Sequence, residues 1–113
     1  MHLKIAVLPG DYIGPEVMAA ALPVLEAVLK KSGHTLEHST HDVGGAGIDN
    51  HGKALPDATL EACRAADGVL LGPVSHQDYP SRAQGGINPS GELRIKLDLY
   101  ANIRPARTYE GLA

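Results

Sequence analysis

Leu3-Lys-Ile-Ala-Val-Leu-Pro-Gly-Asp-Tyr-Ile-Gly-Pro-Glu16 carries the strongest fold signals in this chain. Its first six residues form a compact apolar run that ends at Pro9-Gly10, which predicts a buried parallel strand. A loop follows as far as Gly14. Pro15 and Glu16 then mark the start of a helix, because a fixed φ and a negative charge both favour a helix N-terminus. This order of strand, loop and helix predicts an α/β fold.

The same alternation of strand and helix signals continues along the chain. An apolar face at helical spacing predicts a first helix that runs to about Lys31, kinks near Ala19 because of Pro23, and ends at Gly33. The residues on this face are Met18, Ala21, Leu22, Leu25, Val28 and Leu29. The elements expected after it are a sheet-edge strand over 34–43, a glycine loop over 44–47, a helix over 56–66, a buried strand over 69–71, a long loop over 72–87, a helix over 88–98 capped by Asn88, and a closing strand over 99–106.

Length and composition place the chain among small globular domains. It has 113 residues, of which 43% are hydrophobic and 20% charged, and this excludes disordered and fibrous classes. The single Cys63 excludes an internal disulfide and a multi-cysteine zinc site, and its place on a helix face favours buried packing over a nucleophile. We find no bilayer-spanning run and no signal-peptide core, so we expect a cytoplasmic protein.

Charge is unevenly distributed. Residues 82–113 hold five cations and three anions, whereas the whole chain has a net charge of −3. The cations form no basic run and have no interleaved aromatic residues, so we expect no nucleic-acid binding. A small anionic ligand fits these spaced cations better.

Three groups of residues are candidates for a ligand-binding site, and each also has a plain structural explanation. The loop from Gly10 to Gly14 opens a helix where an anion can bind, but it lacks a dinucleotide or P-loop pattern, and a tight turn also explains its glycines. Arg94 and Arg104, if they converge, suit a dicarboxylate or tricarboxylate; the alternative is that both are solvated surface residues. His76, in the long loop, either meets a ligand or is solvated.

The remaining histidines do not form a metal site. His38 and His41 lie an odd number of residues apart in the expected strand, so they point to opposite faces. His34 and His38 share a face but lack a third ligand.

Ordered motifs along the whole chain resemble those of the β-decarboxylating dehydrogenases, the family of isopropylmalate, isocitrate and tartrate dehydrogenases. The matching motifs are residues 4–17, 44–49, 55–60, 69–74, 93–94 and 97–106. The resemblance implies an isocitrate/isopropylmalate dehydrogenase-like α/β fold, with residues 1–113 as an incomplete N-terminal segment of the first domain. It implies NAD- or NADP-dependent oxidative decarboxylation of a 3-substituted malate, Mg²⁺ or Mn²⁺, and a homodimer.

The resemblance also implies roles for individual substrate-binding residues. Arg94 and Arg104 match arginines that hold the substrate carboxylate. Asn88 and Ser90 lie in the stretch that shapes the pocket for the substrate's side chain. Both are small and polar, which disfavours an isopropyl group and suits a polar C3 substituent, as in isocitrate or tartrate. The substrate stays open between these classes.

On the cofactor side, Ile13 matches a position against the cofactor. The segment 74–88, with His76 and Ile87, resembles the one that borders the nicotinamide. Tyr12 stands where the family usually has glycine, so the first loop is expected to be altered or less flexible.

The family's third substrate arginine, its catalytic tyrosine and lysine, and its metal-binding aspartates come later in the chain than residue 113. We therefore expect no catalytic and no metal-binding residue among residues 1–113, and the choice between NAD and NADP stays open. The alternatives to a part of a dehydrogenase are a non-catalytic anion-binding or regulatory module and an inactive truncated product.

Overall fold

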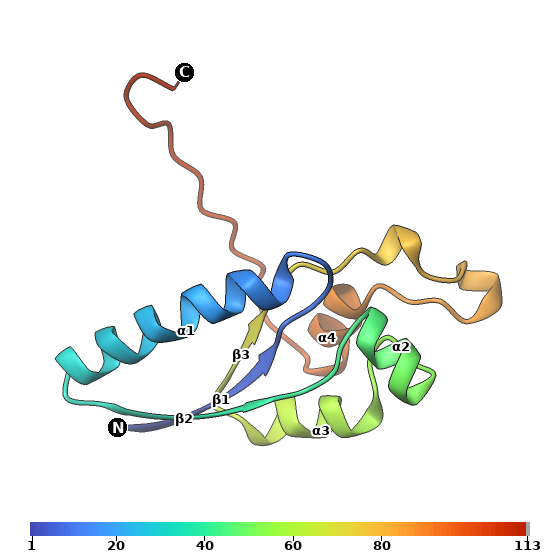
Figure 1. The fold of residues 1–113 in the computed structure, drawn as a ribbon, viewed down its shortest axis with the longest axis horizontal. Coiled ribbons are helices and arrows are strands. Elements are labelled where there is room, and N and C mark those ends of the chain that lie inside the picture. The colour runs from blue at the N-terminus through green and yellow to red at the C-terminus, as the bar shows by residue number, and fades with distance from the viewer. Residues whose placement is uncertain (113) are drawn as a thin grey trace.

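A computed structural model describes residues 1–112 of the chain. It has a parallel sheet of three strands, β1 (His2–Leu8), β2 (Thr35–Thr40) and β3 (Gly68–Leu71), in the order β2-β1-β3. Helices lie on both sides of this sheet (Figure 1). β1 is the central strand, and its Ala6, Val7 and Leu8 are fully buried, whereas the equally apolar β3 is half-buried. The predicted α/β class and the edge position of the second strand are confirmed.

Helix α1 (Gly14–Lys31) follows the first loop, as predicted. Met18 is buried and Ala21, Leu22, Leu25 and Leu29 are half-buried on the sheet side. Val28 was expected on this face but is 55% exposed. The helix continues through Pro23, and the kink stays a prediction.

The end of α1 is formed as the sequence predicts. Gly33 has a φ of +76°, a left-handed conformation that glycine adopts without a steric penalty. The amide of Gly33 donates to the carbonyl of Lys30, and the amide of His34 donates to that of Leu29 at 2.8 Å. These bonds satisfy the last helical carbonyls and turn the chain into β2.

The glycine loop predicted over 44–47 is wrong, because helix α2 (Gly45–His51) occupies this stretch. Glycine is unfavourable in a helix, but here it permits close packing. A Cβ on Gly47 would lie 2.5 Å from the carbonyl oxygen of Lys53, so the chain returns against α2 only because that position has no side chain. Tertiary packing therefore overrides the weak helix propensity of these residues.

Helix α3 (Asp57–Ala65) agrees with the prediction and covers the second face of the sheet. Leu60 and Cys63 are buried on its inner side, and Ala66, directly after it, packs against the core. The strand predicted over 69–71 is β3, which begins one residue earlier, at Gly68. The core on this side consists of Ala6, Leu8, Val43, Leu55, Leu60, Cys63 and Leu93.

The long segment after β3 contains two short 3₁₀ turns, η1 (His76–Asp78) and η2 (Arg82–Gln84), before helix α4 (Pro89–Lys96). Asn88 caps α4 as predicted, since its Oδ1 accepts the amide of Ser90 at 3.1 Å. The helix ends two residues before the predicted position, and Asp98 has a left-handed φ of +51°.

The closing strand predicted over 99–106 is wrong. This segment has no regular structure and runs away from the body of the protein (Figure 1). Tyr100 and Ile103 are exposed. A strand needs a neighbour for its backbone hydrogen bonds, and within residues 1–112 neither edge of the sheet pairs with this segment. Of the helices described, none is long and apolar enough to cross a membrane.

Candidate functional site

The loops that leave the carboxyl ends of the three strands meet around one carboxylate. Asp11 follows β1, and its Oδ1 accepts the amide of Gly45 at 2.8 Å, after β2. Its Oδ2 accepts the amide of Ser75 at 2.8 Å and the hydroxyl of Tyr79, both after β3. We call these four residues the Asp11 cluster. Because ligands of parallel α/β folds bind at this end of the sheet, the cluster fixes the part of the molecule where a site is expected.

The electrostatics of the cluster follow from its hydrogen bonds. Burial raises the pKa of Asp11, but the bonds from Tyr79, Ser75 and Gly45 outweigh it, so the pKa lies below its ordinary value of 3.8. Burial raises the pKa of Tyr79, and the bond to the Asp11 carboxylate raises it further. At neutral pH the pair is therefore a carboxylate and a neutral phenol, an arrangement that positions loops and does not transfer protons.

The first glycine loop is sterically a tight turn. Gly10 has a φ of +82°, and a Cβ there would lie 2.1 Å from the carbonyl oxygen of Pro73. The amide of Asp11 donates to that same oxygen at 2.8 Å. Of the two explanations offered for these glycines, the turn accounts for them fully, and anion binding at this helix N-terminus stays a prediction.

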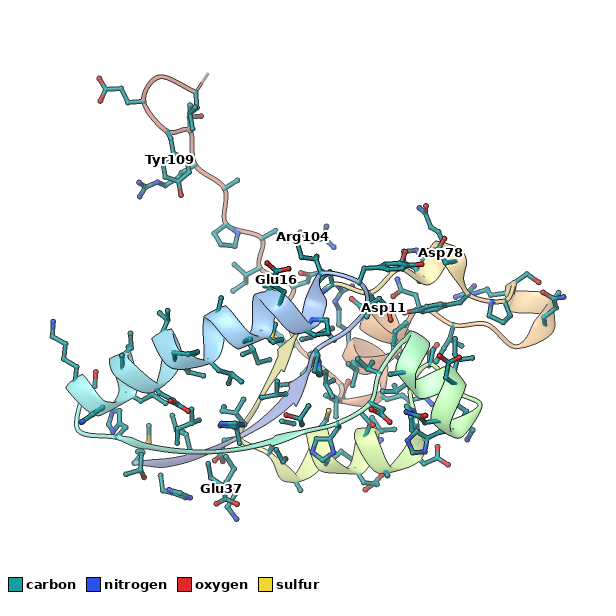
Figure 2. The ribbon with its side chains drawn as sticks, viewed as in Figure 1. Asp11, Glu16, Glu37, Asp78, Arg104 and Tyr109 are labelled. Atoms are coloured by element: carbon teal, nitrogen blue, oxygen red, sulfur yellow. The ribbon has the colours of Figure 1, made fainter. Side chains whose placement is uncertain are left out.

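Tyr12 occupies the turn in a left-handed conformation, with a φ of +49°. Its side chain is 80% exposed, and its hydroxyl donates to Asp78 Oδ2 at 3.1 Å. The backbone thus keeps a conformation suited to glycine, while the side chain adds a contact that glycine cannot make. Figure 2 shows Asp11 and Asp78 at the same end of the molecule.

Three of the predicted substrate residues belong to α4 and its cap: Asn88 is the N-cap, Ser90 lies in the first turn and Arg94 in the last. Arg94 Nη2 donates to Ser90 Oγ at 2.9 Å, because residues four apart share one face of a helix. Asn88 uses its Oδ1 for the helix cap, which leaves its Nδ2 group to donate elsewhere. The guanidinium, the Ser90 hydroxyl and the Asn88 amide all retain donor capacity, which suits a carboxylate.

The cofactor candidates from the long segment line one hollow of about 410 Å³. Its walls include exposed His76, half-buried Ile87 and the substrate candidate Asn88. Ser90 and Arg94 line a second hollow of about 650 Å³ against β3 and α3. The two groups of candidates are therefore adjacent along the chain but face different hollows.

Two candidates lie apart from these groups. Ile13 is the N-cap residue of α1 and is 58% exposed; it is not among the lining residues of either hollow. Arg104 lies on the exposed segment after α4 (Figure 2). The convergence of Arg104 and Arg94 on one ligand stays a prediction.

Sequence reasoning missed Asp11 and Tyr79 as site-forming residues. They are 68 positions apart, and neither belongs to a local pattern that indicates the other. The only usable signal was a carboxylate directly after a buried strand, at the end of the sheet where ligands bind.

The part of the chain that the structure describes contains no group of three His, Cys, Asp or Glu side chains placed to hold a metal ion. His38 and His41, whose side chains are predicted to point to opposite faces, contact different residues. His38 faces Glu26 at 3.5 Å, and His41 bonds to Ser39 at 2.7 Å.

Comparison with known proteins identifies the fold. Residues 4–113 match the family model described as isocitrate/isopropylmalate dehydrogenase. The chain is 49% identical to the 3-isopropylmalate dehydrogenases of Photobacterium profundum and Escherichia coli K12, over 96% and 98% of its length. Each alignment covers 31% of the relative, so the chain spans about a third of the length of the relatives it matches.

Solved structures agree with this match. Isocitrate dehydrogenase from Methylococcus capsulatus superposes with a TM-score of 0.78 and 40% identity, over 98% of this chain and 30% of that one. A β-decarboxylating dehydrogenase from Thermococcus kodakarensis, in its apo form, superposes with a TM-score of 0.70 and 32% identity, over 87% of this chain and 27% of that one. The chain belongs to the isocitrate/isopropylmalate dehydrogenase family, and its fold is that of the N-terminal portion of that family.

Proposed function

We propose that the protein oxidatively decarboxylates a 3-substituted malate with NAD or NADP, and that this chain supplies part of the substrate and cofactor site. The observation that carries the proposal is the group of donors on α4, where Arg94 Nη2 donates to Ser90 Oγ at 2.9 Å and the guanidinium is thereby held in place. A guanidinium held in one orientation can grip a carboxylate with two parallel hydrogen bonds. Family membership supports the same reaction class.

In this proposal Arg94 binds a carboxylate of the malate moiety and orients it, and Arg104 binds the same substrate from the segment after α4. Orientation is itself catalytic, because it replaces a random encounter by a fixed geometry. Ser90 holds the guanidinium, and the Asn88 amide donates to the substrate from the N-terminus of the helix.

Which C3 substituent of the substrate the site accepts depends on how many polar groups near Arg94 already have hydrogen-bond partners within the protein. Asn88 Oδ1 is occupied by the helix cap, and Ser90 Oγ accepts from Arg94. Internal hydrogen bonds lower the cost of placing such groups beside an apolar substituent. The names of the relatives include both isopropylmalate and isocitrate dehydrogenases. We therefore propose a 3-substituted malate with either an isopropyl or a carboxymethyl group, to be decided by direct assay of both.

The hollow lined by His76, Ile87 and Asn88 fits a part of the nicotinamide cofactor, since it combines an apolar wall with polar groups and lies beside the proposed substrate residues. A bound nicotinamide supplies the hydride acceptor. Ile87 would offer it an apolar surface, while His76 would offer a hydrogen bond. Ile13 is proposed as a further contact from the N-terminus of α1. Residues 1–112 contain no group of three His, Cys, Asp or Glu side chains placed to bind the divalent metal that the family uses.

The test compares the wild-type protein, as its own cell makes it, with Arg94→Ala and Arg94→Lys. Loss of a charged bidentate contact of about 1.5–3 kcal/mol lowers kcat/KM for the malate about ten- to hundredfold. Arg94→Lys restores only part of it, because an ammonium lacks the planar fork. Arg107→Ala is the control, since Arg107 stacks on Tyr109 in the exposed segment and has no proposed role. Unchanged kcat/KM in Arg94→Ala refutes the carboxylate assignment.

The same samples test the non-catalytic alternative. An anion-binding module without chemistry raises its unfolding temperature with citrate-like anions and reduces no nicotinamide. The cytoplasmic location and the homodimer stay predictions.

A further inference from the structure

A second set of hydrogen bonds joins the loop after β1 to the segment after β3, next to the Asp11 cluster. Asp78 Oδ2 accepts the hydroxyl of Tyr12 at 3.1 Å and the hydroxyl of Ser75 at 2.6 Å. These bonds lie beside a cleft of about 300 Å³ whose walls include Asp11, Tyr12, Asp78 and Tyr79. Asp11 thus holds Ser75 and Tyr79, the residues that flank η1, and Tyr12 holds Asp78, the last residue of the turn.

The Tyr12 contact is formed from a backbone conformation that disfavours it. A residue with a Cβ in the left-handed region is destabilised relative to glycine, and Tyr12 has a φ of +49° there. Its ring buries little surface, since the side chain is 80% exposed. Packing therefore does not explain a tyrosine at this position, and the hydroxyl is the group with a partner.

The position of η1 determines the position of a proposed ligand residue. His76 is the first residue of η1 and lines the 410 Å³ hollow, and Asp78 is the last residue of the same turn. Three residues of 3₁₀ helix have no stability of their own. If the bond between Tyr12 and Asp78 is lost, the turn keeps its internal bond from Ser75 Oγ to Asp78. The side-chain hydrogen bonds that then tie residues 75–79 to the first loop are those that Asp11 accepts from Ser75 and Tyr79, which flank the turn.

We propose that Tyr12 is a positioning residue, which holds the turn His76–Asp78 against the first loop through its hydroxyl and thereby places His76 at the hollow. The consequence for cofactor binding rests on the proposed function; the ordering of the turn does not.

The test uses Tyr12→Phe, which keeps the ring and the left-handed residue and deletes the hydroxyl alone. Hydrogen exchange of the amides over 75–79 is expected to become about five times faster, the change that about 1 kcal/mol of lost hydrogen bonding produces. The unfolding temperature falls by no more than the ~4–8 °C that about 1 kcal/mol produces in a domain of this size. The matched control is Tyr100→Phe, the same chemical change at a fully exposed side chain.

A second variant identifies the partner. In Asp78→Asn the acceptor loses its charge, so exchange over 75–79 rises, and adding Tyr12→Phe to it has less effect than in the wild type. Additive effects of the two substitutions refute the direct bond between Tyr12 and Asp78.

The kinetic readout separates positioning from general stability. Tyr12→Phe raises the KM for NAD or NADP by about the same fivefold factor and leaves the KM for the malate unchanged. Unchanged exchange over 75–79 overturns the proposal whatever the kinetics show. Faster exchange in a protein whose wild type reduces neither cofactor supports the ordering role of Tyr12 and overturns the proposed function.

Discussion

Replacing Asp11 by asparagine tests whether one carboxylate holds the three loops together. The two oxygens of Asp11 accept three hydrogen bonds, from the Gly45 amide on one side and from Ser75 and Tyr79 on the other. An asparagine side chain has one oxygen and one NH₂ group. Whichever way the amide is turned, at least one buried donor then faces another donor.

The better orientation keeps the oxygen toward Ser75 and Tyr79 and leaves the amide of Gly45 unpaired. Loss of one hydrogen bond to a charged acceptor costs about 1.5–3 kcal/mol, and the other two bonds weaken because their acceptor becomes neutral. We therefore expect Asp11→Asn to lower the free energy of unfolding by about 2–3 kcal/mol, a large part of the stability of a domain of this size.

The assay is urea-induced unfolding at pH 7, followed by circular dichroism. Asp49→Asn is the matched control, because Asp49 lines the same cleft, is exposed, and has no hydrogen-bond partner within residues 1–112. It removes the same charge and changes stability by no more than about 0.5 kcal/mol. A loss below about 1 kcal/mol in Asp11→Asn, or an equal loss in Asp49→Asn, refutes the view that the Asp11 cluster holds the loops.

Other predictions follow from single contacts. Because the pKa of Asp11 is lowered in the folded protein, its contribution is fully present above the ordinary value of 3.8 and is lost as pH falls through the folded pKa; acid unfolding of the wild type should therefore be steeper than that of Asp11→Asn. Gly47→Ala destabilises by about 1–3 kcal/mol because its Cβ meets the carbonyl of Lys53 at 2.5 Å, whereas Gly91→Ala, with its nearest atom at 3.9 Å, stabilises α4 by about 0.5–1 kcal/mol; thermal unfolding of the pair checks both signs. Asn88→Ala removes the cap of α4 and costs about 1 kcal/mol, while Asn88→Asp retains most of it.

Local signals predicted the elements whose ends are defined by their own residues. The start of α1 follows from Pro15 and Glu16, its end from Gly33, and the cap of α4 from Asn88, and all three agree with the structure. These features depend on backbone geometry within a few residues, which is what sequence patterns report.

The errors came from residues whose state depends on contacts outside their own pattern. Gly47 lies in a helix although glycine disfavours one, and the carbonyl of Lys53, six positions on, packs where a side chain at Gly47 would lie. The segment 99–106 has strand-like residues, but a strand forms only where a neighbour accepts its hydrogen bonds. The Asp11 cluster joins Asp11 to Tyr79 across 68 positions, so topology alone brings the two together.

The central claim is that residues of α4, Arg94 above all, bind the carboxylate of a 3-substituted malate in an NAD- or NADP-dependent oxidation. The most direct measurement is nicotinamide reduction and carbon dioxide release by the protein as its own cell makes it, with isopropylmalate and isocitrate as substrates, for the wild type and Arg94→Ala. Equal amounts of reduced cofactor and carbon dioxide, with a rate that falls about ten- to hundredfold in Arg94→Ala, are the predicted result. Reduction of neither cofactor with either substrate, or turnover that Arg94→Ala leaves unchanged, contradicts the claim.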